Sequence, residues 1–182
     1  MKPIYVEVLI RTDLDALWEL TQNPLLHPQW DLRFSSITPT EQGRFVYTRR
    51  IPLHTITGRG ISVGEVRRPD GTRTSALRFD TDDRLSPLRQ GRGYWRYVPT
   101  AEGIRFITGY DYEPGFGRLA DRVLRPVIRW MTAWSFDRLR LSAETGRLPR
   151  WWQPRAGRCI TTPPPRGAMH DAPVTLATLE AP

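Results

Sequence analysis

The chain has very few residues of the kinds that bind metals or form disulfides. Its 182 residues include one cysteine, Cys159, which excludes an intramolecular disulfide and a cysteine-based metal framework. The three histidines, His27, His54 and His170, stand apart, and no motif of metal binding or nucleophilic catalysis surrounds them. The sequence therefore predicts no metal and no cofactor, and it assigns no catalytic residue.

Long hydrophobic runs are also missing. No apolar run approaches the roughly 18 residues of a membrane-spanning helix, and no charged and then apolar leader follows Met1. We therefore expect no transmembrane segment and, by default, a cytoplasmic location. A length of 182 residues with 39% hydrophobic residues suits one ordinary domain and is short for two.

Lysine is nearly absent, although the chain is basic. The net charge is +8, and of the 27 basic residues only Lys2 is a lysine. A positive charge of this size is typical of proteins that bind nucleic acids, but these arginines are spread along the whole chain. No recognition-helix pattern, paired zinc ligands or RNP-like strand accompanies them, so we expect no specific nucleic-acid binding.

The first 31 residues predict a strand followed by two short helices. Residues 3–11 are rich in β-branched and aromatic side chains, which favour a strand. Asp13 can cap a helix over residues 13–21, whose apolar positions recur at helical spacing. Pro24 can begin a second, shorter helix, which we expect to end before Pro28.

Residues 32–112 contain short runs of β-forming residues between turn signals, with no helical pattern. Six strands are predicted, at about residues 33–38, 43–51, 54–66, 72–80, 91–99 and 103–112. Residues 69–71 (Pro-Asp-Gly) and 101–103 (Ala-Glu-Gly) are strong hairpin signals. Strands joined in this way are antiparallel neighbours, so we expect an antiparallel sheet of about seven strands.

The stretch from Gly117 to Gly146 is the only long segment with sustained helical periodicity. At about 100° per residue, it has one apolar side and one side with a stripe of arginines. The apolar side carries Leu119, Val123, Val127, Trp130, Met131, Trp134 and Leu141. The other side carries Arg118, Arg122, Arg125, Arg129 and Arg140. We therefore expect the apolar side to face the sheet and the arginines to face water.

Two residues break this helical pattern. Phe136 projects onto the arginine side, and Arg138 projects onto the apolar side between Trp134 and Leu141. Either Arg138 extends past its neighbours to water, or the apolar side lines a cavity and Arg138 supplies a cation at its mouth. An anionic head group would suit Arg138 in the second case.

The end of the chain differs in composition from the rest. Residues 147–182 include seven prolines, a density that favours neither helix nor sheet. We therefore divide the chain into a domain of residues 1–146 and a Pro/Arg-rich, flexible tail of residues 147–182. Trp151 and Trp152 are candidates for attaching the start of this tail to the domain.

This order of elements resembles the helix-grip architecture of the START-like superfamily, also labelled SRPBCC or polyketide cyclase/dehydrase. The first helix contains Leu17-Trp18, and Trp30-Asp31 follows the second, where that family has a Val/Leu-Trp pair and a Trp-Asp pair. The resemblance covers residues 3–146 and specifies the fold better than any reaction. It implies an α+β fold, with a curved antiparallel sheet wrapped around the long C-terminal helix and a cavity between them.

Members of that superfamily bind sterols, lipids, hormones, polyketides or quinones, and a minority catalyse reactions. The resemblance thus implies that this chain binds a hydrophobic or amphipathic small molecule. The candidate contacts are Trp130, Met131 and Trp134 on the helix, with Arg138, Tyr110 and Tyr112 as polar anchors.

Two other functions stay open from the sequence. A polyketide cyclase or dehydratase would need an inward-facing acid or base among Asp111, Glu113 and Tyr110. An interaction module would instead use the arginine side of the long helix and the basic tail to contact an acidic partner or a membrane surface.

Overall fold

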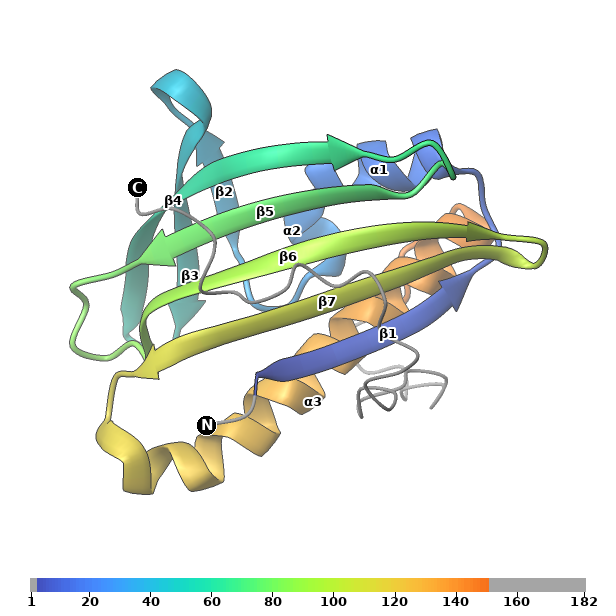
Figure 1. Ribbon diagram of the computed structural model, residues 1–182. Coiled ribbons are helices and arrows are strands. Elements are labelled where there is room, and N and C mark those ends of the chain that lie inside the picture. The colour runs from blue at the N-terminus through green and yellow to red at the C-terminus, as the bar shows by residue number, and fades with distance from the viewer. Residues whose placement is uncertain (1–2, 151–182) are drawn as a thin grey trace.

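The computed structural model describes residues 3–150, which form a seven-stranded antiparallel sheet and three α-helices (Figure 1). The strands are β1 (Ile4–Ile10), β2 (Ser36–Pro39), β3 (Arg44–Ile51), β4 (His54–Arg67), β5 (Arg73–Asp80), β6 (Leu88–Thr100) and β7 (Gly103–Pro114). The helices are α1 (Leu14–Gln22), α2 (His27–Trp30) and α3 (Gly117–Thr145), with a 3-10 turn at Glu41–Gly43. The predicted helix-grip α+β fold is confirmed. The predicted tail, by contrast, lies outside the described residues from residue 151 onward.

The sheet has the strand order β1-β7-β6-β5-β4-β3-β2. Each strand from β2 to β6 pairs with the next one in the chain, and the two predicted hairpins join β4 to β5 and β6 to β7. β1 pairs with β7 at the opposite edge from β2. Figure 1 shows the long strands curving across the molecule, with α3 passing along β1 and β7, which it contacts.

Local signals set the start of α1 and the end of α3. The Asp13 side chain accepts a hydrogen bond from the backbone amide of Ala16 (2.7 Å) and caps α1 as predicted. Gly146 ends α3 in the left-handed conformation (φ 68°). The second helix was predicted wrongly, because Pro28 does not end it. Pro28 instead lies in the first turn of α2, where a proline has no intrahelical amide bond to lose.

Aromatic side chains form the centre of the main core. Phe136 of α3 is fully buried, and its ring stacks on Phe106 of β7 with 4.7 Å between the ring centroids. Trp30 of α2 meets Phe136 edge-on at 6.4 Å, and Tyr97 of β6 lies 5.0 Å from Phe106. These contacts hold α2 and α3 against β6 and β7.

The first half of α3 turns its predicted buried side to the outside. Leu119, Val123, Val127 and Trp130 are 78%, 71%, 47% and 47% exposed. Phe136, which the sequence pattern placed on the wet side, has no exposed surface. The prediction of which side of this helix faces the sheet was therefore wrong.

The reason is that polar side chains on the inner side of α3 are satisfied locally. The hydroxyls of Thr132 and Ser135 donate to the carbonyl oxygens of Ile128 and Met131, both at 2.9 Å. A hydroxyl bonded to its own helix can be buried at little cost, although a hydrophobicity pattern counts it as polar. The inner side of α3 therefore looks hydrophilic in the sequence.

Candidate ligand-binding site

A cavity of about 720 Å³ lies between the sheet and the three helices. Alternate residues of β3 to β7 point into it, because successive side chains of a strand face opposite sides. Its wall is mainly apolar. The sheet contributes Phe45, Tyr47, Ile56, Leu77, Phe79 and Trp95. The helix α3 closes the cavity with Ile128 and Met131. The domain therefore has a sizeable hollow next to its packed aromatic core.

Two glycines of β4 allow aromatic rings to lie flat against the sheet. A Cβ atom at Gly58 would lie 2.2 Å from the ring of Tyr47, and one at Gly60 would lie 2.2 Å from the ring of Phe45. Any side chain at these positions would push the rings into the cavity. The glycines therefore keep this part of the cavity open.

One polar cluster, made of His27, Asp31, Arg33 and Tyr110, interrupts the apolar wall. Asp31 is fully buried and accepts hydrogen bonds from Nε and Nη2 of Arg33, at 2.9 and 2.6 Å. Nε2 of His27 lies 3.0 Å from Asp31 Oδ2. The Arg33 guanidinium lies 5.5 Å from the centroid of the Tyr110 ring. Since His27, Arg33 and Tyr110 all line the cavity, a ligand would meet this cluster.

Burial and charge together fix the protonation of the polar cluster. Burial alone would raise the pKa of Asp31, but the charge of Arg33 and the hydrogen bonds from Arg33 and His27 outweigh it, and the pKa falls well below its usual range. Burial lowers the pKa of His27, with Asp31 opposing this only in part. At neutral pH Asp31 is therefore ionised and His27 is neutral. Because the carboxylate only accepts, His27 carries its proton on Nε2.

Acidification is expected to destabilise the fold through His27. Its pKa is lower in the folded chain than the value of about 6.5 for an unfolded histidine, so the unfolded chain takes up the proton first. The free energy of unfolding should fall below about pH 6.5, by at most about 1.4 kcal/mol per pH unit. Urea denaturation between pH 7 and 5 should show a smaller fall for His27→Gln.

His54 provides the control for this pH effect, because it lies at the surface beside Asp83. The variant His54→Gln should keep the fall seen in the wild type. The pKa of Asp31 is also lowered, but its contribution is lost only below about pH 4, where unfolded carboxylates take up protons. Equal pH dependence in the wild type and His27→Gln would contradict the assignment to His27.

Of the six site residues that the sequence suggested, some line the cavity and others do not. Tyr110 and Met131 line the cavity. Trp130 and Trp134 do not, and pack against each other with ring centroids 4.8 Å apart. Arg138 does not lie at the cavity mouth. Its guanidinium is buried and donates to the carbonyl oxygens of Trp30, Gln29 and Pro149.

Tyr112 also lies away from the cavity, because its hydroxyl donates to the buried carboxylate of Asp121 at 2.7 Å. In place of these residues, the structure brings His27, Asp31 and Arg33 together, which sequence reasoning missed. A weak signal was present, since His27 and Asp31 are four residues apart, one turn of a helix.

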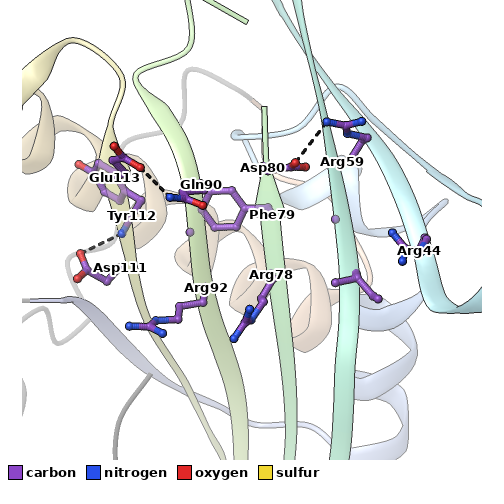
Figure 2. A pocket seen from close by; sticks show the side chains of 13 residues that line it. Arg44, Arg59, Arg78, Phe79, Asp80, Gln90, Arg92, Asp111, Tyr112 and Glu113 are labelled. Carbon is purple, nitrogen blue, oxygen red and sulfur yellow. Dashed lines mark hydrogen bonds and ion pairs between the residues drawn. The ribbon is translucent and has the colours of Figure 1, made fainter. Parts of the chain in front are cut away.

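A second hollow, of about 760 Å³, lies on the outer face of the sheet (Figure 2). Two rows of mostly charged side chains form its walls. One row is Arg44, Arg78, Arg92 and Asp111, and the other is Arg59, Asp80, Gln90 and Glu113. Asp111 and Glu113, the acids proposed for cyclase chemistry, therefore lie outside the apolar cavity. Asp111 is paired with Arg125 (3.3 Å) and Glu113 with Gln90 (2.8 Å).

Solved structures of other proteins have a similar fold. No protein-family model matches the sequence. A STAR-related lipid transfer protein from Xanthomonas axonopodis is 16% identical, with a TM-score of 0.56, and the match covers 74% of this chain and 81% of that one. A protein from Arthrobacter aurescens is 11% identical, with a TM-score of 0.60 and coverage of 81% and 90%. These similarities agree with the helix-grip fold that the sequence resemblance predicted.

A closer similarity in sequence is to the uncharacterized membrane protein YndG of Bacillus subtilis (strain 168). The two are 45% identical over 160 residues, which is 82% of this chain and 60% of that protein. The chain thus spans about 60% of the length of this relative. Among residues 3–150, no helix is both long enough and apolar enough to cross a membrane.

Proposed function

We propose that the protein binds a hydrophobic or amphipathic small molecule, such as a lipid, a polyketide or a quinone, in the cavity between the sheet and α3. The supporting observation is a hollow of about 720 Å³ with mainly apolar walls. Ligand sites are typically about 300–1,000 Å³ and apolar, with a few polar groups that orient the ligand. The fold is shared with a protein named as a lipid transfer protein, which agrees with this proposal. Tyr110 and Met131 remain proposed contacts.

Ile56→Trp is expected to weaken uptake of a neutral apolar probe at least tenfold, because the indole would occupy the cavity that Ile56 now lines. The probe is N-phenyl-1-naphthylamine, whose fluorescence rises in an apolar site. Thr57→Trp is the matched control, since Thr57 is exposed on the other side of the same strand. It should bind the probe as the wild type does.

Native mass spectrometry of protein purified from its host gives a second test of the same cavity. We expect a co-purified lipophile in the wild type and in Thr57→Trp, and none in Ile56→Trp. Thermal melting confirms that each variant is folded. A wild type that takes up no probe and carries no lipophile would overturn the proposed function.

The cavity wall favours an acidic head group on the ligand. The charges of Arg33 and Asp31 cancel, and His27 is neutral, so the polar cluster has no net charge. Arg49 of β3 also lines the cavity, is partly exposed, and has no ion-pair partner among residues 3–150. We propose that Arg49, rather than Arg138, binds a carboxylate or another anionic head.

Arg49→Gln should therefore weaken binding of dodecanoic acid about tenfold and leave binding of dodecanol unchanged, measured by displacement of the probe. Loss of the ion pair affects only the charged ligand, because both ligands share the same apolar chain. Arg50→Gln is the control, since Arg50 is the neighbouring residue and points to the opposite side of the strand. Equal weakening of acid and alcohol would exclude this role for Arg49.

Acid–base catalysis in the same cavity is a second candidate function. Asp31 holds a neutral His27 imidazole at the cavity wall, which is an arrangement suited to a general base. Under this alternative, a polyketide-like substrate is turned over by the wild type. His27→Gln then loses turnover and keeps probe uptake. Of the acids and bases that the sequence suggested, only Tyr110 faces the cavity.

Location and external partners remain proposals. The relative YndG is named as a membrane protein, which supports peripheral contact of this protein with a membrane. We propose that residues 147–182 take part in such a contact, or in contact with an acidic partner, and that residues 1–146 form the ligand-binding domain. The cytoplasmic location stays a prediction.

A further inference from the structure

The first half of α3 carries a continuous apolar stripe on its outer side, made of Leu119, Val123, Val127 and Trp130. All four side chains are exposed, and their spacing of three or four residues places them along one line of the helix. Phe116, also exposed, extends this outer stripe before the helix begins. Apolar surface that is contiguous in this way usually marks a contact site.

Only arginines accompany the outer stripe. Arg118, Arg122 and Arg129 are exposed beside it. The one acidic residue between Phe116 and Trp130 is Asp121, which is buried and bonded to Tyr112 and Arg125. Every exposed residue of this half of α3 is thus apolar, glycine, proline or arginine. The exposed charges on this half of the helix are therefore all positive.

The fold itself does not use the outer stripe. The opposite side of the helix does the packing, where Ile128 lines the cavity and Leu124 meets the core. In Figure 1 these first turns of α3 lie at an edge of the molecule, away from β2 to β5. Within the described residues 3–150, the outer stripe therefore remains exposed and can contact a partner.

We propose that the outer stripe docks the protein on the surface of an anionic lipid bilayer. Helices that lie in a membrane interface have this composition, with Trp, Leu and Val facing the acyl chains and arginines facing the head groups. The arginines complement lipid phosphates, and no exposed acid on this half of the helix would repel them. This docking is separate from the binding of a small molecule in the cavity.

Sedimentation with vesicles tests the proposal on the full chain. The wild type should bind vesicles of phosphatidylcholine and phosphatidylglycerol (7:3) and not vesicles of phosphatidylcholine alone. Val123→Asp with Val127→Asp should lower the partition coefficient at least tenfold. The matched control is Leu25→Asp with Val66→Asp, two apolar residues that are 77% and 59% exposed elsewhere and receive the same added charge. The control should bind as the wild type does.

A second variant separates charge from apolar contact. Arg122→Gln with Arg129→Gln leaves the outer stripe intact, and it should bind anionic vesicles less tightly and with a weaker dependence on salt. Thermal melting shows that each variant is folded. If the wild type does not bind anionic vesicles, the proposal is overturned. Unchanged binding of both variants would also overturn it, as would a wild-type dimer that the double aspartate variant converts to monomer.

Discussion

Asp31→Asn is expected to lower the free energy of unfolding by about 3–5 kcal/mol, as removal of one partner from a buried ion pair does. Asp31 has no exposed surface and accepts three hydrogen bonds from Arg33, two from its guanidinium and one from its backbone amide, and one from His27. Asparagine fills the same volume but removes the negative charge, and Arg33 is left without its counter-charge. Urea denaturation at pH 7 gives the comparison with the wild type.

Two further variants show whether the loss comes from the uncompensated charge. The double variant Asp31→Asn with Arg33→Gln should be more stable than Asp31→Asn alone, because both charges are then removed. Asp82→Asn removes an acid whose ion pair with Arg59 is at the surface, and it should change stability by less than about 1 kcal/mol. A loss below about 1 kcal/mol for Asp31→Asn would contradict the importance of the cluster.

Phe136→Ala is expected to destabilise the fold by about 3–5 kcal/mol, the usual cost of removing a buried phenylalanine ring. Phe136 is fully buried between Phe106 and Trp30, and the neighbouring rings cannot collapse fully into the space. Trp130→Ala removes a larger side chain but should cost less than about 1 kcal/mol, because Trp130 is half exposed.

The comparison of these two variants tests which side of α3 faces the sheet. The hydrophobicity pattern alone predicts the opposite order, with Trp130 buried and Phe136 exposed. Thermal or urea denaturation of the two variants under the same conditions is sufficient. A larger loss for Trp130→Ala than for Phe136→Ala would show that the helix presents its other side to the sheet.

The parts of the fold that local chemistry determines could be predicted from the sequence. Asp13 caps a helix through its own side chain, and Gly146 ends one because it adopts a positive φ angle. The hairpins at residues 69–71 and 101–103 likewise depend on residues within the turn. Once each strand from β2 to β6 pairs with the next one, the order of β2 to β7 follows, whereas the place of β1 beside β7 depends on a long-range pairing.

The candidate site could be predicted only in part, because it depends on contacts between distant segments. The sequence suggested Met131 and Tyr110 as ligand contacts, and both side chains line the cavity. The polar cluster gains its significance from the contact of Arg33 with Tyr110, which lies on a strand far along the chain. Arg138 was assigned to the wrong environment, since its guanidinium ties α3 to the backbone of α2.

In the two proposals above, α3 separates the ligand in the cavity from the bilayer on its outer side. Ile128 and Met131 face the interior, and Val127 and Trp130, their neighbours in the chain, face outward. An α-helix is only about 10 Å across with its side chains. A ligand that shifts α3 from inside the cavity therefore also moves the outer side of the helix. By thermodynamic linkage, the effect of the ligand on bilayer binding then equals the effect of the bilayer on ligand binding. If ligand binding raises the affinity for a bilayer by some factor, bilayer binding raises the affinity for the ligand by the same factor. A protein that releases its ligand at a bilayer must therefore bind the bilayer more tightly when it is empty.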